Sequence, residues 1–381
     1  MQPTSLAVGI AVVAIVIVGV RLARGHGALG HPMHDVLSWG ILGCGDVTEK
    51  KSGPAAFNSA DGKSQVVAVM RRQAALARDY ALRHGVPAWT AQSAELVNNP
   101  TVNAVYIASP PGSHLELALA VASARKPCIV EKPMARNLAE SRAMSEAFRA
   151  QGVPLFVAYY RRAYPRIIRL KQLVGSGAVG RVLEVTYSFS SPRKARPGWR
   201  VDAAVSGGGL FVDVGSHALD LLDFVIGPLR HVSGVARGPQ GEVGAVEEFV
   251  HAKFRFDCGA VGEAIWDFAA ASSEDTLTIV GSTGRVTVPL LMNGDTIQVE
   301  TDREADSSHA AKYVDPPPPV VQRPFVASVI EALQAGDKAL CASTAESGLR
   351  TAAVMDAILD TYYGGRADAF WERPSTWPQQ Q

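Results

Sequence analysis

The sequence predicts an α/β protein with a doubly wound parallel sheet in its first half, a strand-rich second half and an N-terminal transmembrane helix. Three observations lead to this fold class. Short apolar strands alternate with helical segments as far as about residue 160, a glycine loop follows the first strand, and residues 1–20 carry no charged side chain. With 381 residues, 47% hydrophobic and 19% charged, the chain has the composition of a globular protein of roughly two or three domains.

The N-terminal segment is apolar enough to cross a membrane. Residues 1–20 contain the run SLAVGIAVVAIVIVGV, and Arg21 and Arg24 follow it. About 20 apolar residues suffice for a membrane-spanning helix, and a cleavable signal peptide would carry basic residues before the run. We predict an anchor over 1–24 and a linker over 25–35, with the folded domains on the cytoplasmic side. The alternative is that translation starts at Met33, which would make the protein cytoplasmic and soluble.

The first strand of the predicted sheet ends in a glycine loop within VLSWGILGCGDV. A dinucleotide fold needs one glycine for the tight turn, here Gly43, and a second for close approach of the backbone to pyrophosphate, here Gly45. The following helix would direct the N–H groups of Asp46 and Val47 at the phosphates. Thr48 stands where a third Gly or Ala is common, so the motif is partial and an ordinary turn is the competing interpretation.

The alternation continues along the chain. We expect strands in SQVVAVM, VNAVYIASPP, PCIVEKP and VPLFVAYY, and helices in the segments between them. Ligands of such sheets bind beyond the carboxyl ends of the strands, where the glycine loop, ASPPGSH and EKP all fall. This convergence predicts that the nucleotide site includes Ser109, Pro110, His114, Glu131 and Lys132.

The end of the second strand indicates which nucleotide is bound. NAD-preferring folds place Asp or Glu there for the ribose 2′-hydroxyl, but this chain has Arg71 and Arg72. Guanidinium groups can pair with the 2′-phosphate of NADP. Solvated helix-start residues are the alternative, although cations at a helix N-terminus oppose its dipole. We therefore predict NADP(H), with NAD(H) as the second choice.

The order GCGDV, ASPPGSH, EKPMA and GGGLFVDVGSHALDLL resembles the Gfo/Idh/MocA family of oxidoreductases, over residues 36–364. The resemblance implies a Rossmann domain, a second domain built on a large, mostly antiparallel open sheet, and NAD(P)-dependent chemistry on sugars, polyols or related diols. It also implies a homo-oligomer, a dimer or tetramer. Accordingly we expect a nucleotide domain over 36–160, a substrate and oligomerisation domain over 161–365, and a tail over 366–381.

The segment SGGGLFVDVGSHALDLLDFVIG is predicted to carry part of the chemistry. Asp213, His217 and Asp220 have the spacing i, i+4 and i+7, which would place them on one helix face. A carboxylate one turn from an imidazole can orient it and raise its basicity, which suits proton transfer near neutral pH. A capping aspartate and a core histidine are the alternative. The triple glycine before the helix and the family resemblance favour the catalytic interpretation.

Lys132 is the other predicted catalytic residue. Pro133 disfavours helical geometry at Lys132 and can fix a turn there, even through a cis bond. The ammonium would then face the nicotinamide pocket and stabilise negative charge on the reacting oxygen. A surface lysine in a β–α loop is the alternative.

The substrate is predicted to contact Tyr160, Arg161, Trp199 and Arg200, which offer hydroxyl and cationic groups and an apolar wall. Interdomain packing is the alternative for these residues. Two other function classes remain open: a lyase or glycosidase that uses bound NAD transiently, and a non-catalytic NADP-binding sensor.

Composition excludes further classes. Lys+Arg 37 against Asp+Glu 36 gives a net charge of +1, which does not favour a nucleic-acid partner. The four cysteines form no CxxC pair, so we predict neither a metal site nor a disulfide framework.

Overall fold

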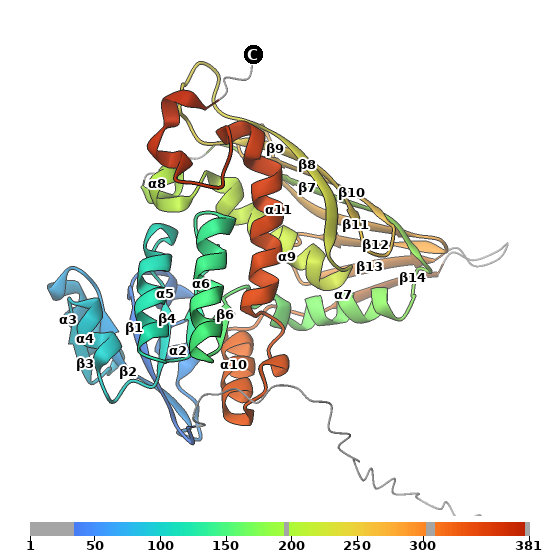
Figure 1. Ribbon diagram of the computed structural model, residues 1–381. Helices are drawn as coiled ribbons and strands as arrows, with labels where there is room; N and C mark the ends of the chain where they lie inside the picture. Colours follow the sequence, from blue (N-terminus) through green and yellow to red (C-terminus); the bar gives the residue numbers. More distant parts are fainter. Residues whose placement is uncertain (1–33, 194–197, 302–308, 378–381) are drawn as a thin grey trace, which may run out of the picture.

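The computed structural model describes residues 34–193, 198–301 and 309–377, which form two sheets with helices packed between and around them (Figure 1). The first sheet has six parallel strands in the order β3-β2-β1-β4-β5-β6. Its strands are β1 Leu37–Leu42, β2 Ser64–Met70, β3 Ala88–Thr90, β4 Ala104–Ile107, β5 Cys128–Val130 and β6 Leu155–Val157. The predicted doubly wound parallel sheet is therefore present.

Helices cover both faces of this sheet because its central strands are apolar on both sides. Val105 and Ile107 of β4 belong to one apolar cluster, to which α4, α5 and α6 contribute, whereas Tyr106 faces the other cluster, which includes α2 and α3. The helices of the chain are α1 Asp46–Lys50, α2 Pro54–Phe57, α3 Ala74–His84, α4 Ser93–Asn98, α5 His114–Ser123, α6 Leu138–Gln151, α7 Pro165–Gly175, α8 Ala203–Ser206, α9 Ser216–Val225, α10 Arg323–Ala335 and α11 Ala345–Tyr363.

The strand order reverses between β1 and β4, and this reversal positions the site. In such sheets a crevice opens beyond the carboxyl ends of the strands at the reversal. The loops after the two strands are joined directly, because Ala108 N donates a hydrogen bond of 2.8 Å to Leu42 O. The glycine loop and the ASPPGSH segment therefore lie side by side.

The second sheet has eight strands in the order β14-β13-β12-β11-β7-β10-β9-β8. All neighbouring strands are antiparallel except β7 and β10. The strands are β7 Val182–Ser190, β8 Leu229–Arg237, β9 Phe249–Phe256, β10 Val261–Asp267, β11 Glu274–Gly281, β12 Gly284–Pro289, β13 Thr296–Thr301 and β14 His309–Val314. The mostly antiparallel sheet expected from the family resemblance is thus observed.

Among the described residues, helices cover one face of the second sheet, α7, α9 and α11 among them (Figure 1). On this face Trp266 of β10 packs edge-on against Phe211, with ring centroids 4.8 Å apart. The alternating residues point the other way, and Val235, Val261 and Ile265 are exposed there. The sheet is therefore open on its outer face.

The last part of the chain returns to the first domain. Gln322, just before α10, donates its backbone N–H to Lys51 O at 3.0 Å, and Phe156 of β6 forms a bridge with Thr344 before α11. Figure 1 shows α11 alongside α6. The segments before α10 and α11 therefore pack against the nucleotide-binding domain, although these contacts join residues far apart in the sequence.

The predicted transmembrane helix has to be corrected. Across 34–193, 198–301 and 309–377, no helix is long and apolar enough to span a membrane. The longest, α11, has 19 residues but carries four charged side chains, Glu346, Arg350, Asp356 and Asp360. The predicted anchor, residues 1–20, lies outside the described residues. The fold of the described residues is thus that of the two domains, and it includes no membrane-spanning helix.

Candidate active site

The glycine loop has the geometry that close approach of a nucleotide requires. Gly43 has φ +95°, and a Cβ there would lie 2.8 Å from Ser109 N. Gly45 is different, because the nearest atom to its Cβ position is Gly43 O, at 3.8 Å. Gly43 is thus required by the protein itself, whereas the space beside Gly45 is open and fits the pyrophosphate of a dinucleotide.

Thr48 explains why the third glycine of the motif can be absent. Its hydroxyl accepts a hydrogen bond from Gly45 N at 3.0 Å and donates one to Gly45 O at 2.9 Å, so it closes the loop locally. Asp46 is exposed and pairs with Lys50 at 2.5 Å, and Val47 is half-buried. Both lie in the first turn of α1, directly after the loop.

The two arginines lie at the carboxyl end of β2. Arg71 is half-buried and its Nη1 donates to Cys44 O in the glycine loop at 3.4 Å, while Arg72 is exposed. No acidic residue lies between Met70 and Asp79. Burial raises the pKa of the Cys44 thiol to about 11, so this neighbour stays neutral. The charge at this edge of the crevice is therefore positive.

His114 lies beneath the loops and ties two of them together. It is fully buried, with Nε2 2.7 Å from Ser109 O and Nδ1 3.2 Å from Met134 O. Burial lowers the pKa of His114 although the two carbonyl groups oppose the shift. Ser109 and Pro110 are half-buried beside it. We conclude that His114 positions the loops after β4 and β5.

The EKP segment is held from both domains. The Glu131 carboxylate accepts hydrogen bonds from Tyr106 OH and from Gln322 Nε2, each 2.7 Å long. The peptide bond between Lys132 and Pro133 is cis. Sequence reasoning missed Tyr106 and Gln322, because a tyrosine in a buried strand and a glutamine after a polyproline run carry no signal for this contact.

Lys132 and Asp213 form an ion pair across the two domains. Lys132 Nζ lies 2.5 Å from Asp213 Oδ1 and 2.7 Å from Asp213 O. Arg200 Nε donates to the other carboxylate oxygen at 3.0 Å. Burial opposes ionisation of Asp213, but the charges and hydrogen bonds of Lys132 and Arg200 hold its pKa below the ordinary value. Asp213 is therefore an anion between two cations.

Within the described residues no hydrogen bond joins the Asp213 carboxylate to the imidazole of His217, the contact that the helical spacing suggested. Asp213 lies in a π-helical turn, Phe211–Gly215, that precedes α9. The Asp213 carboxylate is instead bound by Lys132 and Arg200, and His217 Nδ1 has no hydrogen-bond partner. Asp220, the third member of the predicted face, accepts hydrogen bonds from Arg162 at 2.8 and 2.9 Å.

His217 lies among aromatic rings close to the ion pair. It is 6% exposed, and its ring centroid is 5.4 Å from that of Tyr160 and 6.0 Å from that of Tyr159. Nδ1 is buried without a hydrogen-bond partner. Burial, followed by the charges of Arg161, Lys132 and Lys51, lowers the pKa of His217 well below its ordinary value. The imidazole is therefore neutral and able to accept a proton.

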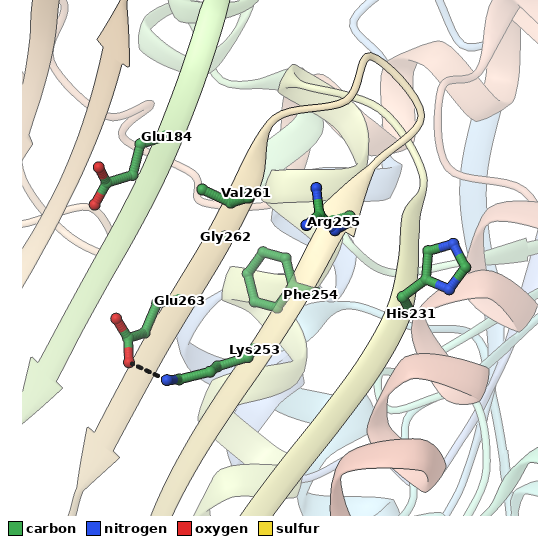
Figure 2. Close-up of a pocket in the computed structure, with 8 residues that line it drawn as sticks. All are labelled: Glu184, His231, Lys253, Phe254, Arg255, Val261, Gly262 and Glu263. Carbon is green, nitrogen blue, oxygen red and sulfur yellow. Dashed lines mark ion pairs between the residues drawn. The ribbon is translucent and has the colours of Figure 1, made fainter.

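The predicted substrate residues come from two segments of the chain, and each segment contacts the candidate site, Tyr160 at His217 and Arg200 at Asp213. Tyr160 and Arg161 are buried at 2% and 8% exposure in the turn after β6. Trp199 and Arg200 are half-buried, with the guanidinium 4.5 Å from the indole centroid. Lys51, which sequence reasoning missed, adds a further cation. Figure 2 shows a separate hollow on the outer face of the second sheet, in which Lys253 pairs with Glu263 at 3.7 Å. None of the predicted site residues lines this hollow.

Two further kinds of site find no support in the described part of the chain. No group of three or more His, Cys, Asp or Glu side chains there is arranged to hold a metal ion. The cysteines are free thiols, namely Cys44, Cys128, Cys258 and Cys341.

Comparison with known proteins identifies the family. Residues 37–159 match the model of the oxidoreductase family with an NAD-binding Rossmann fold, and residues 167–287 match the GFO/IDH/MocA C-terminal domain. The chain is also 32% identical to Oxidoreductase P35 of Formosa agariphila, over 87% of its own length and 100% of the relative. The chain belongs to the Gfo/Idh/MocA family. It is an NAD(P)-dependent oxidoreductase.

Other members of the Gfo/Idh/MocA family act on diols and sugars. Trans-1,2-dihydrobenzene-1,2-diol dehydrogenase of Danio rerio is 28% identical over 72% of this chain and 81% of the relative. The structure of levoglucosan dehydrogenase in complex with NADH and levoglucosan superposes with a TM-score of 0.75 at 24% identity, covering 85% of this chain and 96% of the other. The likeness to levoglucosan dehydrogenase, at this identity, shows a shared fold.

Proposed function

We propose that this member of the family transfers a hydride between NADP(H) and a CH–OH or carbonyl carbon of a sugar, polyol or related diol. The observation that carries the proposal is the group formed by Lys132, Asp213 and His217. The Lys132 ammonium is held by the half-buried carboxylate of Asp213 across the two domains, and its charge acts on the imidazole of His217, which burial keeps neutral. Relatives named for levoglucosan and for a dihydrodiol support the substrate class.

The preference for NADP(H) is supported by the charge at the end of β2. Arg71 and Arg72 occupy the position where an acidic side chain would bind a ribose 2′-hydroxyl. A guanidinium forms charge-assisted hydrogen bonds with phosphate, and it cannot be deprotonated in proteins. Arg71 is already held against the glycine loop by Cys44 O.

When bound, the nicotinamide supplies or accepts the hydride, and the side chains of this chain manage the proton and the charge. We assign Lys132 to the reacting oxygen, where its ammonium stabilises developing negative charge. Asp213 fixes the direction of that ammonium through two hydrogen bonds. His217 takes the proton of the substrate hydroxyl during oxidation and returns it during reduction, because burial and nearby cations favour its neutral form.

One experiment separates this proposal from its alternatives. Purified protein is mixed with NADPH or NADH and a panel of sugar, ketose and diketone substrates, and with NADP⁺ and polyols in the reverse direction. A dehydrogenase gives a change in nicotinamide absorbance equal to the product formed. A lyase or glycosidase with bound NAD gives product without net change in absorbance, and a sensor binds the nucleotide without turnover. Either of the last two results would contradict the proposal.

We also propose a homo-oligomer formed through the open face of the second sheet. Exposed apolar side chains lie on this face, including Val235, Val261 and Ile265, and Val261 also lines the hollow of Figure 2. Light scattering after size exclusion should give a dimer or tetramer, and Ile265→Lys should shift the protein toward the monomer. A parent protein that is monomeric at micromolar concentration would contradict this.

A further inference from the structure

Arg161 is a buried cation without a carboxylate partner. The residue is 8% exposed, Nε donates to Met292 O at 3.0 Å, and Nη1 donates to Tyr160 OH at 2.9 Å. Within the described ranges no carboxylate oxygen lies within 4.0 Å of this guanidinium, and its Nη2 donates no hydrogen bond. The protein therefore fixes the direction of the group but leaves part of its donor set free and gives it no ion pair; the carboxylate of Asp275 acts on it only from beyond 4.0 Å.

The neighbouring arginines show that the fold does satisfy a structural guanidinium. Arg162 is equally buried and pairs with both Asp220 and Asp223, at 2.8 and 3.0 Å. Arg166, also buried, has no ion pair among the described residues and its Nε has no partner, but its Nη1 and Nη2 donate to carbonyl oxygens of the turn at residues 289–291. An unpaired buried charge is unfavourable unless a counter-charge reaches it. Arg161 differs from Arg162 in having no carboxylate within 4.0 Å among the described residues, and from both neighbours in having an Nη2 that donates no hydrogen bond there, which an anionic ligand would explain.

Arg161 is also in the right place to meet a substrate. Its guanidinium carbon lies 4.9 Å from the ring centroid of Tyr160, and that ring is in turn 5.4 Å from the ring of His217. Arg161 and Tyr160 follow β6, at the same sheet edge as Lys132 after β5. A group bound by Arg161 would therefore belong to the molecule whose hydroxyl faces His217.

The acidic side chains nearby are already used. Asp213 is shared by Lys132 and Arg200, and Glu131 accepts from two neutral donors. Lys51 adds another positive charge that acts on His217. Cations therefore outnumber free acidic groups around the imidazole, and the potential at the substrate position is positive.

We infer that the substrate is a sugar acid whose carboxylate is bound by Arg161, an aldonate or uronate rather than a neutral sugar. The inference rests on the proposed dehydrogenase function and narrows its substrate class. A planar guanidinium suits a carboxylate because adjacent N–H groups can donate in parallel to both oxygens. The hydrogen bonds of Arg161 to Met292 O and Tyr160 OH fix the plane of the guanidinium before the substrate binds.

The test compares charged and neutral forms of the same carbon skeleton. Gluconate and glucuronate are each assayed against the corresponding amide and against glucitol and glucose, with NADP⁺ or NADPH, by nicotinamide absorbance. We expect at least about a 30-fold higher kcat/KM for the acid than for its amide, the size typical of a desolvated charged pair. Arg161→Gln should remove this preference, because kcat/KM should fall at least about 30-fold more for the acid than for its amide. Arg149→Gln, on the exposed side of α6, is the charge-matched control and should keep the preference.

Several results would overturn the inference. Parent protein that uses the neutral forms as well as the acids would contradict it while leaving the dehydrogenase proposal intact, and this comparison needs no variant. If Arg161→Gln lowers kcat/KM equally for the acid and for the amide, Arg161 has a structural role and does not bind the carboxylate. Arg161→Lys and the melting temperatures of both variants show whether the protein still folds. If kcat/KM is higher for a phosphorylated sugar than for the sugar acid, the group bound by Arg161 is a phosphate and not a carboxylate. No turnover of any compound would contradict the proposed function itself.

Discussion

Alanine substitutions at the two glycines of the loop should have opposite effects on folding and on nucleotide binding. At Gly43, φ is +95° and the new Cβ would meet Ser109 N at 2.8 Å and Ser109 Cα at 3.0 Å. A non-glycine residue in such a conformation costs about 1–3 kcal/mol, and the backbone overlap adds to this cost. Gly43→Ala should therefore lower the free energy of unfolding by about 2 kcal/mol or more.

At Gly45 the backbone is extended, with φ −155°, and the nearest atom to a new Cβ is 3.8 Å away. Gly45→Ala should change the free energy of unfolding by less than about 1 kcal/mol, because a compatible alanine mainly affects the unfolded chain. The methyl group would, however, occupy the space through which the backbone approaches pyrophosphate. We expect the Kd for NADPH to rise at least about tenfold, equivalent to about 1.4 kcal/mol.

Melting temperatures of the nucleotide-free proteins and titration calorimetry with NADPH measure the two effects separately. At about 2–4 °C per kcal/mol for domains of this size, Gly43→Ala should melt several degrees below the parent, whereas Gly45→Ala should not. Gly45→Ala with the parental Kd would show that the nucleotide does not approach this position. Gly43→Ala with the parental melting temperature would refute the clash with Ser109.

Three further predictions concern cofactor choice and chemistry. Lys132→Ala and His217→Ala should each lower kcat by about 10²–10⁴-fold with NADPH affinity changed only a few-fold, and near-parental turnover in both would refute the assigned roles. Replacing Arg71 and Arg72 by Leu should weaken NADPH binding far more than NADH binding, measured by calorimetry; equal losses would remove the argument for NADP. Because the pKa of His217 lies below its ordinary value of about 6.5, its neutral form is fully present above that pH. The rate of oxidation should fall with acid only below about pH 6.5, and a His217-dependent fall at or above pH 7 would contradict the neutral imidazole.

Much of the nucleotide domain was predictable because its signals are local. Apolar strands, the glycine loop and the cis-proline turn depend on residues adjacent in sequence, and the strand order then brings their ends to one edge. The anchor prediction was wrong for the fold as described, since it relied on an apolar run and on no contact with the rest of the chain. The predicted pairing of Asp213 with His217 is not among the hydrogen bonds of the described residues, because Lys132 and Arg200, which come from other segments of the chain, bind the Asp213 carboxylate.

The sequence by itself determined the family, the parallel sheet and the residue types of the site, since these follow from periodicity and from motifs a few residues long. Only the tertiary structure decided the partner of each polar group. Lys132 meets Asp213 across 81 residues, and Gln322 reaches Glu131 across 191. Arg162 forms ion pairs with two carboxylates, whereas Arg161, one residue before it, forms none among the described residues. Counter-charges in a folded chain come from distant segments packed together, so neighbouring residues of one type can have different electrostatic surroundings.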